Sequence, residues 1–401
     1  MVACGLRPFF LLAVILLFLS SLPLLLYHNL VIQMAHVQQY PAPASQRNLS
    51  ILLWHWPFGR SYSLSGNKCL EMYGIGHCFL TDDKSAYPTA DVVVFHHQEL
   101  SNAASALPMH LPRPMAQGWV WLSMEPPVNN ANVKRLNGVF NWTMSYRRDA
   151  DVTIPYGETI PGAGMQGFQS SLKRSCFASW VVSKSKPNQT RVDVYQSLQK
   201  YIPIQVYGKW KKKPLPDDRL LPTISKCLFY LSFENSEAKD YISEKLWRNA
   251  FQSGTIPVVL GPSRPTYEEV APPHSFIHVA DFKSVVELAA YLNHVAADKQ
   301  AYEEYFKWHK THRIKTYTDW RERLCQICLK YPISLNLNQL ASQSKNRRLA
   351  RPLGCCPAPL RGSIHIRGAS RPPSIQRPSA HPGTTEEQKG KDTVKTVVKN
   401  T

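Results

Sequence analysis

Short apolar runs, separated by longer polar or mixed stretches, recur along the chain. In the first half they lie at residues 51–56, 91–97 and 119–124. In the second half they lie at 179–183, 204–207, 227–233, 256–260 and 276–279. Their length and their β-branched and aromatic content predict strands, and strands that alternate with helical segments predict parallel sheets covered by helices. A stretch rich in Gly and Pro at 157–167 divides the two sets, so we predict two α/β domains with a ligand cleft between them.

The most informative pattern lies at residues 229–262. An apolar run ends at polar Glu234, Asn235 and Ser236, which suit the exit of a strand and the start of a helix. A segment of helical period continues to about Gln252, and a second apolar run follows at 256–260. This order predicts a strand, a helix and a parallel strand with a right-handed crossover.

Three side chains of the predicted helix share one face. Tyr241, Glu244 and Lys245 stand at positions i, i+3 and i+4. An aromatic ring, a carboxylate and an ammonium then point the same way, beside backbone amides that bind anions at a helix N-terminus. The pattern predicts a nucleotide site, and the alternative is a solvated helix face.

The N-terminus predicts a membrane anchor. Residues 8–28 contain no Asp, Glu, Lys or Arg, and this length spans a bilayer core of about 30 Å as a helix. Arg7 precedes the span, so residues 1–7 are expected in the cytosol and the body in the lumen. A cleaved signal peptide is the alternative, but the small-residue pattern at 42–44 lies far beyond the apolar run. Residues 29–48 are expected to form a stem.

Charge distribution argues against a nucleic-acid partner. The chain has 401 residues, 44% of them hydrophobic, and a net charge of +19. Twelve basic and three acidic residues lie between Lys345 and the C-terminus, so +9 belongs to this segment and +10 to all the rest. We predict that residues 334–401 form a disordered basic tail, with binding of anionic partners as one role for it. The remaining surplus suits an enzyme that binds a diphosphate.

Residues 229–262, FYLSFENSEAKDYISEKLWRNAFQSGTIPVVLGP, closely resemble the donor-binding signature of the α-1,3-fucosyltransferases of glycosyltransferase family 10. The family usually has His at the position of Ala238 and Thr at that of Ser243. The resemblance extends over about 51–332 and includes the segments WVWLSMEPP, FNWTMSYRRDADVTIPYG and DWRERLCQICLKYP. It implies a GT-B type fold, in which two Rossmann-like domains face a cleft. The acceptor-side domain would comprise residues 49–160 and the GDP-fucose-binding domain residues 161–333.

The resemblance also implies an activity and a setting. It implies inverting transfer of L-fucose from GDP-β-L-fucose to the 3-hydroxyl of N-acetylglucosamine in lactosamine glycans of glycoproteins and glycolipids. The subfamily match implies α2,3-sialylated acceptors and sialyl Lewis x type products, made by a type II protein of the Golgi membrane. No cofactor or bound metal is required, and stimulation by manganese stays open. Departures at Pro126, Lys184 and Ala238 suggest the alternative of a catalytically impaired paralogue that binds glycans.

One carboxylate is expected to take the proton of the acceptor hydroxyl. Glu125 follows the apolar run 119–124, and the carboxyl ends of strands are where α/β folds place ligand groups. The resemblance places the family's proposed base at this position. The alternative is an exposed loop acid.

A departing diphosphate needs fixed cations or amides. The resemblance implies Arg191 and Lys245 for the phosphates, with Tyr241 and Glu244 at the nucleoside portion. The full expected donor site is Arg191, Asn235, Ser236, Tyr241, Glu244 and Lys245.

The acceptor side is less clearly marked. His96, His97 and Glu99 end a predicted strand and are candidate acceptor contacts. Adjacent strand residues face opposite sides, so the two His side chains do not suit one metal ion, and we predict no metal site. Asp149 and Asp151 form a DxD pattern, which we interpret as structural.

Cysteines and glycosylation triplets fit an oxidising lumen. The resemblance implies disulfides among Cys69, Cys78, Cys325 and Cys328, either local or as Cys69 with Cys325 and Cys78 with Cys328. Cys176 and Cys227 are a further candidate pair. The predicted glycosylation sites are Asn48, Asn141 and Asn188.

Overall fold

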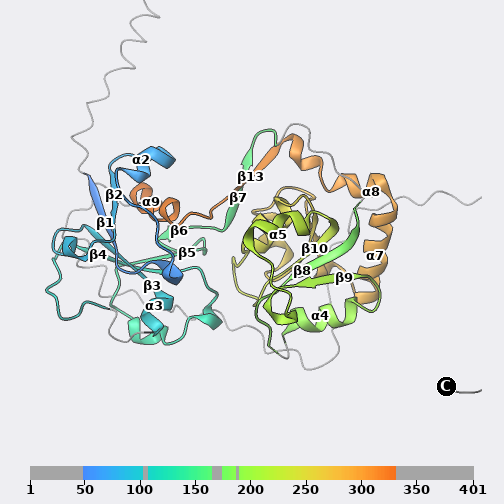
Figure 1. Cartoon of the computed structure of the whole chain (residues 1–401), viewed down its shortest axis with the longest axis horizontal. Helices are drawn as coiled ribbons and strands as arrows, with labels where there is room; N and C mark the ends of the chain where they lie inside the picture. The colour runs from blue at the N-terminus through green and yellow to red at the C-terminus, as the bar shows by residue number, and fades with distance from the viewer. Residues whose placement is uncertain (1–47, 103–106, 165–173, 187–188, 331–401) are drawn as a thin grey trace, which may run out of the picture.

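The computed structural model describes residues 48–102, 107–164, 174–186 and 189–330, which form two lobes side by side (Figure 1). The predicted membrane anchor, the stem up to residue 47, the basic tail and Asn188 lie outside these residues. Within the described ranges, no helix has the length and apolarity needed to cross a bilayer.

The N-terminal lobe contains a six-stranded parallel sheet in the order β2-β1-β3-β4-β5-β6. The strands are β1 (Leu49–Leu53), β2 (Cys78–Thr81), β3 (Val92–His96), β4 (Gly118–Ser123), β5 (Trp142–Ser145) and β6 (Val152–Thr153). The helices of this lobe include α2 (Lys68–Tyr73) and α3 (His97–Asn102). β3 and β4 are buried along their whole length, as expected for parallel strands covered on both faces. β1, β3 and β4 correspond to the predicted strands of the first half.

The C-terminal lobe contains a five-stranded parallel sheet in the order β12-β11-β10-β8-β9. Its strands are β8 (Cys176–Val181), β9 (Ile204–Tyr207), β10 (Cys227–Phe233), β11 (Ile256–Leu260) and β12 (Ile277–His278). Its α-helices are α4 (Thr190–Leu198), α5 (Asp217–Ile224), α6 (Arg264–Glu268), α7 (Val285–Ala297) and α8 (Lys299–Glu304). All five strands had been predicted, and the prediction of an α/β fold with parallel sheets is confirmed.

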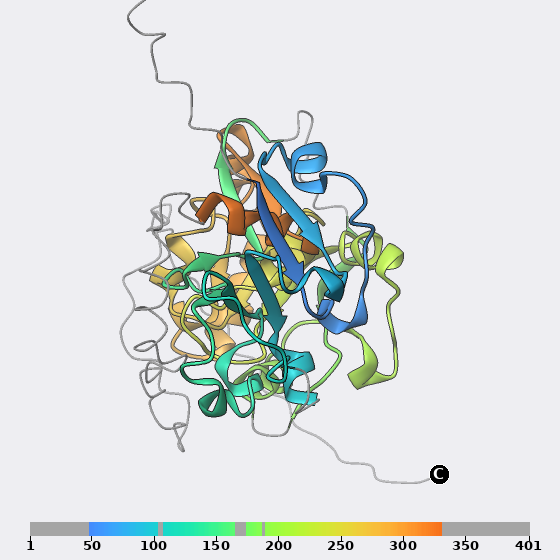
Figure 2. The ribbon, with the colours of Figure 1, turned by 90° about the vertical axis from the view of Figure 1, so that its left-hand side faces the viewer.

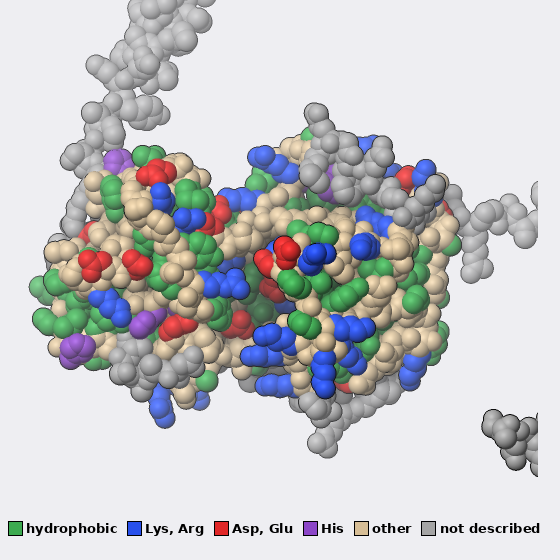
Figure 3. All heavy atoms as spheres, viewed as in Figure 1, with side chains coloured by type: hydrophobic (Ala, Val, Ile, Leu, Met, Phe, Trp, Pro, Cys, Tyr) green, Lys and Arg blue, Asp and Glu red, His purple; other side chains and the backbone are tan. Residues whose placement is uncertain are grey.

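The chain passes between the lobes twice. β7 (Gly157–Pro161) leads out of the N-terminal lobe and pairs with the antiparallel β13 (His312–Thr316), which leads back. The final helix α9 (Trp320–Lys330) then lies in the N-terminal lobe (Figures 1 and 2). Figure 3 shows a hollow between the two lobes, with basic and acidic side chains along its edges.

Two disulfides fasten α9 to the N-terminal lobe. Cys69 of α2 is bonded to Cys325, and Cys78 of β2 is bonded to Cys328. The sulfur atoms of Cys69, Cys78 and Cys325 lie within 4.8 Å of one another, but the disulfides already engage each of them. The long-range connectivity is therefore the one present, and α9 belongs to the N-terminal lobe although the predicted division placed it in the C-terminal domain.

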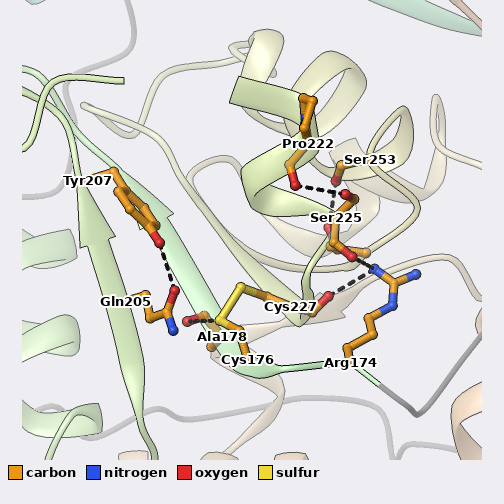
Figure 4. Close-up of a disulfide and its surroundings, with 10 residues drawn as sticks. Arg174, Cys176, Ala178, Gln205, Tyr207, Pro222, Ser225, Cys227 and Ser253 are labelled. Atoms are coloured by element: carbon orange, nitrogen blue, oxygen red, sulfur yellow. Dashed lines mark hydrogen bonds between the residues drawn. A yellow bond between two sulfur atoms is a disulfide. The ribbon is translucent and has the colours of Figure 1, made fainter. Parts of the chain in front are cut away.

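A third disulfide joins neighbouring strands of the C-terminal lobe. Cys176 and Cys227 face each other across the parallel pair β8 and β10 (Figure 4). Beside this bond, the Arg174 guanidinium donates to the carbonyls of Ser225, Cys227 and Gly254 at 2.6 to 2.9 Å (Figure 4 shows the first two). The bond lies at the amino ends of these strands, away from the edge where their carboxyl ends meet.

The segment between β10 and β11 differs from the predicted regular helix. Asp240 has φ 61°, a left-handed conformation that interrupts a helix, and the helix begins only at Glu244. Lys245–Phe251 then forms a π-helix, a form that often occurs at functional sites. Gly254, with φ 69°, follows its end. Tyr241 therefore lies in a loop, and the common helix face proposed for the three residues is wrong.

The two described glycosylation triplets differ in accessibility. Asn48 is exposed. Asn141 is 4% exposed, and its Oδ1 accepts hydrogen bonds from the backbone of Trp119 at 2.8 Å and from Arg113. A glycan has no room at Asn141 in this fold, so the expectation for Asn141 is corrected.

Candidate functional site

A buried ion pair lies at the carboxyl end of β10. Glu234, 3% exposed, accepts hydrogen bonds from the backbone N–H of Ser243 at 2.7 Å and from its hydroxyl at 2.8 and 2.9 Å. Lys245 Nζ lies 3.0 Å from Glu234 Oε2. The carboxyl ends of parallel strands form the ligand edge of such sheets, so the pair stands where a bound group is expected.

Lys245 is held as a fixed cation. Burial opposes its charge, but the carboxylates of Glu234 and Glu244 outweigh burial and raise the pKa of Lys245. Glu244 Oε1 lies 3.2 Å from Nζ, and Ser243 Oγ accepts a hydrogen bond from Nζ at 2.7 Å. Burial raises the pKa of Glu234, and the Lys245 ammonium and the Ser243 hydrogen bonds counteract this. Because each group around Glu234 donates to it, we assign Glu234 as a carboxylate.

Arg191, on α4, supplies a second buried cation. Its side chain donates to the carbonyl of Lys184 at 2.5 Å and to Gln189 Oε1 at 3.2 Å. Burial lowers the pKa of Arg191, and the charge of Glu234 counteracts this. Among the residues that the structure describes, no carboxylate oxygen lies within 4.0 Å of its guanidinium. Within the described part of the chain, its charge is therefore held by neutral acceptors and not by an ion pair.

Asn235 and Ser236 lie on the loop between β10 and the π-helix that carries Lys245. Gln189 Nε2 donates to the carbonyl of Asn235 at 3.2 Å, which links this loop to the one before α4. Ser236 Oγ donates to Asn235 Oδ1 at 3.2 Å. Both side chains are partly exposed, so the loop presents an amide and a hydroxyl beside the buried charges.

Tyr241 extends from the C-terminal lobe into the N-terminal lobe. It is 2% exposed, and its ring centroid lies 5.0 Å from that of Tyr146 and 6.2 Å from that of Tyr156. Burial raises its pKa well above the usual value, and the negative charges of Glu234, Glu244 and Glu125 act in the same direction. Tyr241 therefore links the predicted donor site to the N-terminal lobe, where the charge of Glu125 acts on it.

Glu125 stands on a braced turn directly after β4. Its Oε2 accepts a hydrogen bond from Asn129 Nδ2 at 2.7 Å. Asn130 Nδ2 donates to the backbone carbonyl of Glu125 at 3.1 Å, and Ser123 Oγ donates to Asn130 Oδ1 at 2.8 Å. Sequence reasoning missed these two asparagines, and their place four and five residues after the acid was the available signal. Oε1 of Glu125 has no hydrogen-bond partner among the described residues.

A pocket of about 280 Å³ lies next to this cluster, between the lobes. Tyr146 and Tyr156 line it from the N-terminal side, and Asp240 and Trp247 from the C-terminal side. Glu125, the two cations and Glu244 do not line it. The pocket therefore adjoins the ionic site but does not contain it.

His96 and His97 point to different surroundings. His96, 1% exposed, is hydrogen-bonded through Nδ1 to Glu99, whose other oxygen accepts from the backbone of Phe58 at 2.9 Å. The Trp121 indole donates to His97 Nδ1 at 3.1 Å, and burial lowers the pKa of His97. The two histidines therefore serve separate buried contacts, and neither joins the cluster around Lys245.

Asp149 and Asp151 also point to different partners. Asp149 forms an ion pair with Arg147 at 2.5 Å. Asp151 Oδ2 accepts from the backbone and the hydroxyl of Thr143 at 2.8 and 2.9 Å. These contacts are those of a structural turn.

α9 brings Arg323, a further residue that the sequence did not single out, next to Tyr156. Arg323 lies over the rings of Trp320 and Tyr156, with centroid distances of 4.7 and 5.5 Å. Its position follows from the disulfides of α9, so no local sequence signal marks it.

Comparison with known proteins gives a consistent assignment. Residues 46–157 match the family described as "Fucosyltransferase, N-terminal", and residues 171–344 match "Glycosyltransferase family 10 (fucosyltransferase) C-term". Alpha-(1,3)-fucosyltransferase 7 of Rattus norvegicus is 46% identical over 73% of this chain and 77% of its own length. The Homo sapiens protein of the same name is 44% identical over 72% and 83%.

Other similar proteins carry related names. A 4-galactosyl-N-acetylglucosaminide 3-alpha-L-fucosyltransferase of Homo sapiens is 44% identical over 70% of this chain and 78% of its own length. A crystal structure of an alpha1,3-fucosyltransferase with GDP-fucose aligns with a TM-score of 0.46 and 18% identity, over 74% of this chain and 94% of that one.

Proposed function

Because this chain belongs to glycosyltransferase family 10, the fucosyltransferases, we propose that it transfers L-fucose from GDP-β-L-fucose, with inversion, to the 3-hydroxyl of N-acetylglucosamine in lactosamine glycans. The observation that carries the proposal is the buried Lys245 ammonium, which Glu234 and Ser243 hold at the ligand edge of the C-terminal sheet. A GT-B type fold is the corresponding proposal for the two lobes.

Glu125 takes the proton of the acceptor hydroxyl in this proposal. Inversion requires the hydroxyl to attack the anomeric carbon opposite the departing GDP, so the base and the phosphate-binding cations belong on opposite sides of the fucose. Glu125 projects from the N-terminal lobe, and Lys245 and Arg191 from the C-terminal lobe. The hydrogen bond from Asn129 orients one carboxylate oxygen and leaves the other for the proton.

Lys245 and Arg191 stabilise the charge that develops on the departing diphosphate. Cations held in place before the reaction stabilise that charge without reorganising. Glu234 and Ser243 fix the position of Lys245, and the Lys184 carbonyl and Gln189 fix that of Arg191. These contacts make each cation a rigid part of the fold.

The nucleoside portion is assigned to Glu244 and Tyr241, with Asn235 and Ser236 at the rim of the donor site. The Glu244 side chain is 47% exposed, so its carboxylate is accessible to hydroxyl donors such as those of a ribose. Tyr241 supplies an aromatic surface at the contact between the lobes.

We further propose an α2,3-sialylated acceptor, sialyl Lewis x type products, and a type II position in the Golgi membrane with the body in the lumen. The similarity to the fucosyltransferases 7 supports this assignment. The three disulfides suit an oxidising compartment.

Transfer from GDP-fucose to sialylated and unsialylated lactosamine, measured in parallel with the purified protein, tests the proposal. We expect fucose at the 3-hydroxyl of N-acetylglucosamine, identified from the linkage of the product. Donor binding without transfer to either acceptor would instead identify a catalytically impaired glycan-binding paralogue.

A further inference from the structure

Arg323 on α9 is a buried cation without a carboxylate partner. Its side chain is 6% exposed, and among the described residues no carboxylate oxygen lies within 4.0 Å of it. It donates through Nη2 to the backbone carbonyl of Tyr317, but its Nε is buried and has no hydrogen-bond partner. Arginine stays protonated in proteins, and a buried charge with an unused donor is costly unless a ligand completes it.

The carboxylates that raise the pKa of Arg323 are already paired with other cations. Burial lowers the pKa of Arg323, and the negative charges of Glu244 and Glu322 counteract this. Lys245 Nζ lies 3.2 Å from Glu244, and Lys315 Nζ lies 2.9 Å from Glu322. Each of these carboxylates forms its ion pair with a lysine, so Arg323 has no ion pair with either of them.

Arg323 lies beside the proposed reaction site. Its guanidinium packs over the ring of Tyr156, whose hydroxyl donates to the carbonyl of Met124 at 2.7 Å. Met124 directly precedes Glu125, and the other neighbour of the Tyr156 ring is Tyr241. One aromatic ring thus separates the unused cation from the residues assigned to proton transfer and donor binding.

We propose that Arg323 binds the carboxylate of the sialic acid in a sialylated lactosamine acceptor and so determines acceptor specificity. This inference rests on the proposed function. A planar guanidinium binds a carboxylate through two parallel hydrogen bonds. The Nε–H of Arg323, which has no partner in the fold, can donate one of them. The rings of Trp320 and Tyr156 give apolar walls suited to a sugar. The carboxylate reaches Nε when one of these rings turns aside, which is an ordinary side-chain adjustment on binding.

Arg321, two residues earlier on α9, is the matched control. It forms an ion pair with Asp319 at 2.7 Å and donates to the carbonyl of Ser63 at 3.2 Å. Its charge is therefore already compensated. Replacing Arg321 removes the same type of side chain from the same helix without removing an unused cation.

The test compares an acceptor that carries free sialic acid with the same acceptor as its methyl ester, which lacks the charge. We expect the wild-type protein to show a kcat/KM at least about tenfold higher for the acid than for the ester. Arg323→Met should lower kcat/KM for the acid by at least about tenfold, leave the ester unchanged and leave the KM for GDP-fucose unchanged. Arg321→Met should keep the preference for the acid.

Other outcomes would overturn the inference. An equal loss with both acceptors would make Arg323 a purely structural residue, and a raised KM for GDP-fucose would assign it to the donor phosphates. Wild-type protein that uses acid and ester equally well would refute the inference without any variant, even if Arg323→Met fails to fold. If wild-type protein transferred fucose to no lactosamine at all, the proposed function would fall together with the inference.

Discussion

Arg148 of the N-terminal lobe forms an ion pair with Asp240 of the C-terminal lobe. Its Nε and Nη2 donate to Asp240 Oδ1 at 3.0 and 2.8 Å, and its backbone N–H donates to Oδ2 at 3.2 Å. Arg148 also pairs with Glu269 next to α6. Asp240 immediately precedes Tyr241, whose ring packs on Tyr146. The ion pair therefore joins the lobes and fixes the residue next to Tyr241.

We predict that breaking this contact lowers both stability and turnover. Arg148→Gln leaves the nearly buried Asp240 carboxylate without its cation and should lower the free energy of unfolding by about 1–2 kcal/mol. Asp240→Asn should cost a similar amount, because Asn tolerates the left-handed conformation and only the charge is lost. In a double-mutant cycle by urea unfolding, the two effects should be non-additive by about 1 kcal/mol.

Arg147 provides the control for this cycle. Its partner Asp149 is 48% exposed and lies in the same lobe. Arg147→Gln should therefore change stability by less than about 0.5 kcal/mol and leave transfer unchanged. Additive effects of the Arg148 and Asp240 variants would show that the two residues do not act together.

Glu125→Gln should abolish most transfer while leaving donor binding intact. Loss of a general base lowers kcat by about 10²–10⁴-fold, and the amide retains the shape of the side chain. Initial rates give kcat, and calorimetric titration with GDP gives the affinity of the donor site. Glu71→Gln, an exposed acid on α2, is the matched control and should leave both quantities unchanged. If Glu125→Gln turned over at the wild-type rate, Glu125 would not be the catalytic base.

Replacement of Lys245 is expected to damage folding as well as chemistry. Lys245→Met leaves the Glu234 carboxylate buried without its cation, which should cost about 3–5 kcal/mol in the free energy of unfolding. In the double variant Glu234→Gln with Lys245→Met, the uncompensated charge is gone, and much of the stability should return. Transfer should stay low in the double variant, because the phosphate-binding cation is absent. Restored transfer there would argue against that role.

Stability should decrease below about pH 6.5 in part through His309. Its ring stacks on Trp308 with a centroid distance of 3.6 Å, and burial lowers its pKa to about 4. The unfolded chain protonates this group near its ordinary pKa of about 6.5, so it binds more protons than the folded chain between these values. The folded state therefore loses stability as the pH falls through this window, by at most about 3 kcal/mol from His309.

Urea unfolding at about pH 7 and about pH 4.5 checks this effect. His309→Gln should show a smaller loss between the two conditions than wild type. Some loss should remain, because burial also lowers the pKa of His97 and His278. His110→Gln, at an exposed position, should behave as wild type. The same loss in His309→Gln as in wild type would exclude His309 as a contributor.

The strands that the sequence predicts well are the ones buried on both faces. β3, β4 and β10 are continuous apolar runs because helices cover both sides of each sheet. β2, β5 and β6 were missed. β2 and β6 are short strands at the edges of the sheet, and β5 lies inside the sheet but has only four residues. The irregular start of the helix after β10 was also missed, because Asp240 owes its left-handed conformation to contacts made across the lobes.

For the site, the sequence identified residue types better than their arrangement. Tyr241, Glu244 and Lys245 do gather near Glu234, although a loop rather than a helix face brings Tyr241 there. The sequence marks Glu234 only as a polar residue at a strand exit, and the fold shows that it is buried. Arg323 lies about eighty positions further along the chain, so its place beside Tyr156 depends wholly on the return of α9.

The return of α9 determines the order in which the protein is completed during synthesis. Cys69 and Cys78 leave the ribosome about 250 residues before their partners Cys325 and Cys328, as the sequence separations of 256 and 250 show. The nascent first lobe must therefore wait, with two unpaired thiols and an uncovered apolar surface, until nearly the whole described chain has been translated. The first lobe to emerge is therefore the last to be finished.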